Sequence, residues 1–270
     1  MHAYRCAAAM LAAALAAGPA AAQQLLDVAP GLDAPERPTT RWTVTIGALG
    51  AVRPAYEGSD AYVGSAVPVF DLRYRDIFFA SVRDGIGVNV LREDWVTLAP
   101  VLRYRFGRDQ DANRALYGMG DIDGTFEAGI LATFGTGPLR LRLEAAQGLN
   151  GGGSEGFQAR ADLTYGTVLG PRLFVAGGPS VTYGDRSFNQ TYFGVSPQQS
   201  VRSGYQPYSA GAGINSVGLS ASANYRLWRG FSLTATGEVK QLLYDAADSP
   251  IVREQTQAFF GLALAWRGGW

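Results

Sequence analysis

The residues most able to do chemistry in this sequence are a few closely spaced carboxylates. The stretch RPAYEGSDAY, from Arg53 to Tyr62, holds Glu57 and Asp60 among turn-forming residues, and Asp121 and Asp123 are two positions apart. Two carboxylates at a suitable separation can act as acid and base in glycoside hydrolysis. The more ordinary use of such acids is hydrogen bonding at the ends of loops. No base or second motif joins either pair, so we expect neither to be catalytic.

The composition of the predicted mature chain excludes histidine chemistry. His2 is the only histidine and Cys6 the only cysteine. A basic start, an apolar run over residues 7–17 and small residues at 20–22 predict a signal peptide that is cleaved before Gln23. Without histidine, the mature chain has no Ser-His-acid triad, no Asp-His dyad and no His-ligated metal. We therefore expect no enzymatic activity, no catalytic residue, no cofactor and no bound metal.

Three segments divide the chain by pattern. Residues 1–22 are the predicted signal peptide, although a retained anchor helix is the alternative. Residues 23–40 carry three prolines and little periodicity, which predicts a periplasmic leader, and residues 41–270 are the predicted folded domain. Export without cysteine is typical of a bacterial periplasmic or outer-membrane protein. The 23 basic residues balance the 23 acidic ones, which disfavours a nucleic-acid partner.

Apolar and polar residues alternate along most of the predicted folded domain. Phe70, Leu72 and Tyr74, for example, alternate with Asp71 and Arg73. Such alternation predicts strands, and no stretch predicts an amphipathic helix. A soluble β-sandwich also alternates. However, charges recur on one face of nearly every run while the other face stays apolar, which favours an all-β, antiparallel transmembrane barrel with its apolar side toward outer-membrane lipid.

The number of strands depends on one ambiguous run. A bacterial single-chain barrel has an even number of strands, but Ile77–Leu91 read as one strand gives eleven. The Asp84-Gly85 pair is a strong hairpin signal. Splitting the run there into Ile77–Arg83 and Ile86–Leu91 gives twelve strands, which we prefer. The alternative is ten strands, with Thr43–Val52 outside the barrel.

Charged residues on the inward faces of these strands fill the predicted lumen. The arginines are Arg73, Arg103, Arg105, Arg140, Arg142 and Arg160, and the acids are Asp71, Glu127, Glu144, Asp162 and Glu238. Unpaired buried charges are costly, so we expect these groups to pair and fill the barrel. The alternative is a charged pore or a ligand site.

Several long motifs resemble a known family. They are, in order, PAYEGSDAYVGSAVPVFDLRYRDIFF (54–79), GIGVNVL (85–91), LRYRFGRDQDANRALYGMGDID (102–123), TYFGVSPQQSVRSGYQPYSAGAGINSV (191–217) and LLYDAADSPIV (242–252). Together they resemble the MipA/OmpV family of MltA-interacting outer-membrane proteins. The resemblance implies a barrel in the cell outer membrane. It also implies a scaffold that joins a lytic transglycosylase to a murein synthase in the periplasm. A small-solute channel and a surface adhesin are the alternatives.

The resemblance supplies motif residues but no catalytic ones to carry over. The candidate site residues, of unknown role, are Tyr56, Glu57, Gly58, Ser59, Asp60, Gly107, Arg108, Gly120, Asp121, Ser249 and Pro250. In the twelve-strand topology the stretch RPAYEGSDAY lies at the extracellular rim, and Tyr56 and Tyr62 are expected in an aromatic girdle. If the strand count is wrong, the same stretch faces the periplasm.

Overall fold

A computed structural model describes residues 40–149 and 155–270. The predicted signal peptide and the predicted leader up to residue 39 lie outside the described residues. The strands are β1 (Trp42–Pro54), β2 (Tyr62–Tyr74), β3 (Phe78–Ser81), β4 (Gly85–Val88), β5 (Leu91–Arg92), β6 (Val96–Arg105), β7 (Thr125–Thr136), β8 (Leu139–Gly148), β9 (Phe157–Leu169), β10 (Leu173–Gly184), β11 (Gly213–Arg226), β12 (Phe231–Leu242) and β13 (Thr256–Gly269). The helices are η1 (Gln110–Ala112), η2 (Arg114–Leu116), α3 (Arg186–Phe193), α4 (Pro197–Ser203) and α5 (Tyr244–Ala247).

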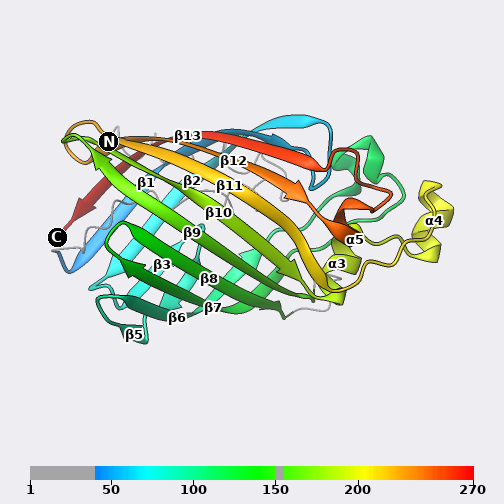
Figure 1. The fold of residues 1–270 in the computed structure, drawn as a ribbon, viewed down its shortest axis with the longest axis horizontal. Coiled ribbons are helices and arrows are strands. Elements are labelled where there is room, and N and C mark those ends of the chain that lie inside the picture. Colours follow the sequence, from blue (N-terminus) through cyan, green and yellow to red (C-terminus); the bar gives the residue numbers. More distant parts are fainter. Residues whose placement is uncertain (1–39, 150–154) are drawn as a thin grey trace, which may run out of the picture.

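The strands form one antiparallel sheet that closes on itself (Figure 1). β1 pairs with β2 on one side and with β13 on the other, from Thr43 opposite Gly269 to Val52 opposite Phe260. β4 and β5 follow each other along the same edge of β6. The thirteen segments in the described residues therefore occupy twelve positions around the barrel. The twelve-strand prediction is confirmed, and the ten-strand alternative is wrong because β1 is hydrogen-bonded on both sides.

The hairpin between β3 and β4 is shorter than predicted. Ser81 lies opposite Gly85, so three residues connect the strands instead of a two-residue turn at Asp84-Gly85. Gly85 has a φ of 75°, a left-handed conformation that glycine adopts without strain. The Asp84 N–H donates to the Ser81 hydroxyl over 2.9 Å. The run is split where we expected, but β3 and β4 have only four residues each.

This short hairpin leaves part of the β2 edge without a partner. β3 pairs only with the segment of β2 from Asp71 to Tyr74, and among the described residues no strand pairs with the outer edge of β2 before Phe70. Because the Phe70 carbonyl accepts from Val82, every second residue back along β2 faces the same open edge. One of these is Pro68, which has no N–H to leave unsatisfied. We call this interruption of the wall the β2 notch.

The strands have the two faces expected of a membrane barrel. In β13 the side chains of Phe260, Leu262 and Leu264 point outward and are 58%, 48% and 50% exposed, whereas Phe259 and Ala263, at alternate positions, are buried. Paired aromatic rings lie near both ends of the barrel wall. At one end the pairs are Trp42 with Tyr74, Trp95 with Phe134 and Trp228 with Phe231. At the other end they are Tyr104 with Phe126 and Phe157 with Tyr183. Such girdles mark the two interfaces of a bilayer. No helix in the described part of the chain is long and apolar enough to cross a membrane.

Connections of different length separate the two ends of the barrel. The C-terminus lies at the end with the short turns, and α3, α4 and α5 gather at the other end (Figure 1). The turn between β2 and β3 has positive φ at Arg75 and Asp76, 47° and 57°, and Ile77 N–H donates to the Tyr74 carbonyl over 2.8 Å. This is a two-residue type I′ turn. Short turns face the periplasm in such barrels, so the helical end is extracellular.

Candidate functional site

Four connections at the extracellular end pack together into one layer, which we call the cap. It comprises residues 55–61, 106–124, 185–212 and 243–255. Its apolar centre contains residues from all four connections: Ala55, Tyr56, Leu116, Met119, Val195 and Ile251. Hydrogen bonds join the connections, since Gln199 donates to the Met119 carbonyl over 2.6 Å and Tyr205 to the Ala115 carbonyl over 3.0 Å. The loops form one packed structure over the barrel.

Local sequence signals explain the two longer helices of the cap. The Asp185 carboxylate accepts from the Phe188 N–H over 2.7 Å and caps the start of α3. Ser196 and Gln199 form a reciprocal capping box at the start of α4. Both are standard helix starts, although the alternation-based prediction contained no helix. That prediction was wrong here because α3 and α4 are only eight and seven residues long, too short for a clear apolar period.

Tyr56 anchors the stretch RPAYEGSDAY in the cap. Its side chain is only 2% exposed, and its hydroxyl donates to the Ile251 carbonyl over 2.7 Å. Burial raises the pKa of Tyr56 to about 12. The expectation that Tyr56 belongs to a girdle is wrong, because the chain turns inward before it, whereas Tyr62 is 45% exposed at the start of β2. The stretch lies at the end of the long loops and not at the periplasmic end.

The rest of this first motif fastens the connection 55–61 to the connection 243–255. Gly58 has a φ of 97°, and a Cβ there would lie 2.5 Å from a methyl carbon of Val252. Its carbonyl accepts from Arg253 over 2.7 Å. Ser59 is fully buried, and its hydroxyl accepts from the Ala61 N–H. Asp60 is exposed at the tip of the turn. Gly58 therefore permits a close approach that other residues would prevent.

The motif at residues 102–123 shapes the connection after β6. Arg108 and Ile122 form an isolated antiparallel bridge, and a Cβ at the buried Gly107 would collide with the Ile122 carbonyl. Gly120 has a φ of 78°, and the Asp121 carboxylate accepts from the Gln110 N–H over 2.8 Å. These contacts keep the connection 106–124 in its folded conformation.

The motif at residues 242–252 joins α5 to the rest of the cap. Ser249 is buried, and its hydroxyl donates to the Phe193 carbonyl at the end of α3. Pro250 is half-buried and directly precedes Ile251, which is fully buried. The structure thus brings the three motifs together in the cap.

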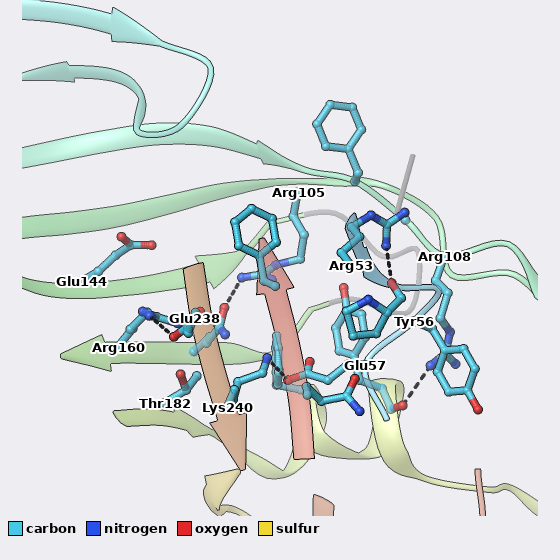
Figure 2. A pocket seen from close by; sticks show the side chains of 18 of the residues that line it. Arg53, Tyr56, Glu57, Arg105, Arg108, Glu144, Arg160, Thr182, Glu238 and Lys240 are labelled. Carbon is cyan, nitrogen blue, oxygen red and sulfur yellow. Dashed lines mark hydrogen bonds and ion pairs between the residues drawn. The ribbon is translucent and has the colours of Figure 1, made fainter. Parts of the chain in front are cut away.

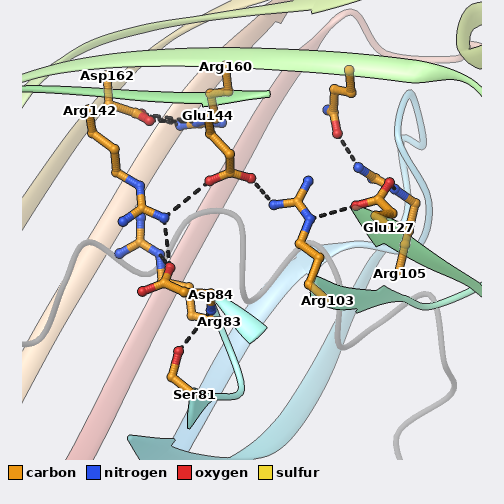
Figure 3. A network of polar contacts seen from close by, with 11 residues as sticks. Ser81, Arg83, Asp84, Arg103, Arg105, Glu127, Arg142, Glu144, Arg160 and Asp162 are labelled. Atoms are coloured by element: carbon orange, nitrogen blue, oxygen red, sulfur yellow. Dashed lines mark hydrogen bonds and ion pairs between the residues drawn. The ribbon is translucent and has the colours of Figure 1, made fainter. Parts of the chain in front are cut away.

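A network of ion pairs crosses the lumen below the cap (Figure 3). Glu127, only 1% exposed, accepts from Arg103 over 2.6 Å and also from Arg105. Glu144 joins Arg103 to Arg142, with 3.2 Å between the charged groups of Glu144 and Arg142. On the neighbouring strand β9, Arg160 pairs with Asp162 and with Glu238 of β12, and nearer the periplasm Arg73 pairs with Asp71. The network matches the predicted pairing and fills the lumen with neutralised charge.

Two residues depart from the predicted pairing. Arg140 is exposed near the periplasmic end of β8 and makes no ion pair with a described residue. Asp84, which we did not predict, reaches into the lumen and accepts from Arg142 over 2.7 Å. It can do so because the short hairpin ends part-way up the wall. The contact between Asp84 and Arg142 was not predicted because the sequence does not give the length of the β3–β4 hairpin.

A cavity of about 110 Å³ lies between the cap and this network (Figure 2). Its lining includes Tyr56 and Glu57 of the motif at residues 54–79 and Gly107 and Arg108 of the motif at residues 102–123. Glu57 pairs with Lys240 of β12 over 2.6 Å. We call this space the cap cavity. Four of the predicted site residues therefore meet around one space, while the other seven build the cap.

The described residues contain no group of three or more His, Cys, Asp or Glu side chains arranged to hold a metal ion. The cap cavity is lined by arginines and aromatic rings, together with carboxylates that are engaged in ion pairs. This arrangement can hold an anion more readily than a cation.

Comparison with known families identifies the chain. A family model described as MltA-interacting protein MipA matches residues 46–268. The chain belongs to the MipA family. Because the match runs from β1 to β13, it covers the whole closed barrel. The protein is therefore an outer-membrane β-barrel of the MipA family.

Solved structures with a similar fold include several outer-membrane barrels. The NanC porin is 10% identical with a TM-score of 0.46, covering 82% of this chain and 98% of the porin. An outer-membrane channel from Pseudomonas putida F1 is 12% identical with a TM-score of 0.48, covering 89% of this chain and 100% of the channel. The KdgM porin is 8% identical with a TM-score of 0.40, covering 82% and 98%. No curated protein sequence matched the chain.

Proposed function

We propose that this MipA-family barrel is a non-enzymatic scaffold that binds peptidoglycan-remodelling enzymes at the periplasmic face of the outer membrane. The observation that carries the proposal is the family match over residues 46–268, since the family is named for interaction with MltA, a lytic transglycosylase. A murein synthase is the second proposed partner. A barrel fixed in the membrane holds such enzymes next to the peptidoglycan layer.

The closed lumen supports a scaffold more than a channel. The ion pairs of Glu127 and Glu144 lie across the barrel, and the cap covers its extracellular mouth with the apolar centre described above. A solute would have to separate buried charge pairs in order to pass, which is costly.

The charge of the periplasmic rim supports an acidic binding surface on the partner. Exposed arginines at the periplasmic ends of the strands and in the short turns are Arg41, Arg75, Arg92, Arg140, Arg172, Arg226 and Arg229. The acids in the short turns are only Asp76, Glu93 and Asp94. A surface with an excess of one charge sign steers and orients a partner of the opposite sign.

A charge reversal at this rim tests the scaffold. Arg172 and Arg226 are adjacent, since the Arg226 N–H donates to the Arg172 carbonyl over 2.8 Å. We expect the intact barrel, solubilised in gentle detergent, to recover a lytic transglycosylase and a murein synthase. The double variant Arg172→Glu, Arg226→Glu should recover at least about tenfold less, because like charges across an interface cost more than 1.4 kcal/mol. Quantitative pull-down is the measurement.

The matched control reverses two exposed arginines in the cap. Arg186→Glu, Arg202→Glu changes the same net charge at the opposite end and should leave recovery unchanged. Absence of both enzymes from the wild-type pull-down would refute the scaffold. Steady single-channel currents from the wild-type barrel in planar bilayers would instead favour the channel.

A further inference from the structure

The cap cavity has more cationic than anionic groups in its lining. Six of its lining residues carry positive charge: Arg53, Arg103, Arg105, Arg108, Arg160 and Lys240. Three carry negative charge: Glu57, Glu144 and Glu238. Each of these three carboxylates already lies in an ion pair, with Lys240, Arg103 and Arg160 respectively. The carboxylates in the lining are therefore engaged. Outside the lining, Glu127 compensates Arg103 and Arg105, and Asp162 compensates Arg160.

Arg108 is the cation with the least compensation. Its side chain is only 6% exposed. One guanidinium N–H donates to the Tyr192 carbonyl over 3.0 Å, but Nε has no hydrogen-bond partner, and no carboxylate of a described residue forms an ion pair with it. Burial lowers the pKa of Arg108 to about 10. The group remains charged at neutral pH, so an uncompensated charge is held inside the protein.

A buried cation without a counterion destabilises the folded protein. Removing one partner of a buried pair typically costs about 3–5 kcal/mol, because the remaining charge has lost its solvent and gained nothing in exchange. An oxyanion beside Arg108 would recover that cost through charge-assisted hydrogen bonds. The planar guanidinium fork matches the two oxygens of a carboxylate or phosphate group.

The neighbours of Arg108 suit such a ligand in charge and size. Figure 2 shows the Arg108 and Arg53 side chains on the same side of the cavity, near Tyr56. Arg53 donates from Nε to the Ser65 hydroxyl over 3.1 Å and from Nη1 to the Pro54 carbonyl over 2.8 Å, contacts that fix its guanidinium. A volume of about 110 Å³ has room for a small oxyanion.

The position of the cap cavity suits a small solute better than a lipid. The β-strand residues that line the cavity, such as Arg105, Arg160 and Glu238, lie on the inward face of the sheet, and all three are largely buried. The outward face carries the exposed apolar side chains. The arginines of the lining fit the charge of a small oxyanion.

We propose that the cap cavity is a binding site for a small oxyanion, carrying a carboxylate or phosphate group, held by Arg108 with support from Arg53. The site lies at the end of the barrel opposite the basic periplasmic rim. It therefore does not depend on the scaffold, and the two proposals can fail separately.

Titration of the folded full-length barrel in detergent tests the site, with inorganic phosphate and acetate as probes at constant ionic strength. Calorimetry should show saturable one-to-one binding of at least one probe. Arg108→Gln should weaken it at least tenfold, which corresponds to about 1.4 kcal/mol. Arg108→Lys keeps the charge but not the fork, so it should weaken binding less than Arg108→Gln.

The control is Arg172→Gln at the periplasmic rim, which should leave the dissociation constant within twofold. Each variant is first shown to be folded by its compact migration in an unheated gel. If Arg108→Gln does not fold, the binding of Arg108→Lys alone is compared with that of wild type. The proposal is overturned if neither probe binds the folded wild-type barrel saturably, or if the folded Arg108 variants bind as wild type does.

Discussion

Replacing Glu127 by glutamine should destabilise the barrel by about 3–5 kcal/mol, the usual cost of removing one partner from a buried charge cluster. Glu127 is almost completely buried and accepts from both Arg103 and Arg105. Glutamine keeps the size of the side chain but removes its charge, so two buried guanidinium groups lose their shared counterion. The measurement is the midpoint of urea unfolding in lipid vesicles, followed by tryptophan fluorescence.

The control for this prediction is Glu93→Gln. Glu93 is exposed in the periplasmic turn before β6, and surface substitutions of this kind usually change stability by no more than about 0.5 kcal/mol. Equal midpoints for Glu127→Gln and Glu93→Gln would contradict the view that paired charges hold the lumen together.

Replacing Tyr56 by alanine should loosen the cap while leaving the barrel folded. Removing a fully buried aromatic side chain costs about 3–5 kcal/mol, and this change also leaves the Ile251 carbonyl without its hydrogen bond. The cap connections should then become accessible to trypsin at Arg202 and Arg253. Limited proteolysis and mass spectrometry of the fragments give the measurement, and the strands should remain protected.

Tyr117→Ala is the matched control for the cap. Tyr117 belongs to the same layer but is 57% exposed, so its removal should leave the rate of cleavage close to that of wild type. The assignment of Tyr56 as an anchor fails if both variants are cut at the wild-type rate, or if Tyr56→Ala unfolds the whole barrel.

The sequence predicts the barrel wall and much of the lumen because both depend on alternation. Arg103 and Arg105 are two positions apart on β6, and Arg103 lies directly opposite Glu127 on β7. Because alternate residues of a strand point to the same face, their positions along β6 and β7 are enough to bring these side chains to the inward face. The pairing of Asp84 with Arg142 escaped prediction, because it depends on how far the β3–β4 hairpin extends and not on parity.

The cap could not be predicted from the motifs that build it. Tyr56 and Ile251 are 195 residues apart in sequence, and no periodicity relates positions in different loops. One signal was present: Leu116 and Ile251 are large apolar residues inside long polar connections, which is unusual unless they pack. The conformation of the loops decides which residues meet, and that depends on contacts between distant segments.

The β2 notch has a consequence for the surrounding membrane. Along most of the wall the bilayer meets apolar side chains over hydrogen-bonded strands. Beside the notch it meets the β2 edge at Gly64 and Ala66, which pair with β1 on the other side but with no described strand on this side. Such groups are costly in hydrocarbon and draw water and lipid headgroups toward them. We therefore expect the outer leaflet to be thinner and wetter on this side than elsewhere around the protein. The barrel would then adopt a preferred lateral orientation relative to its neighbours in the membrane.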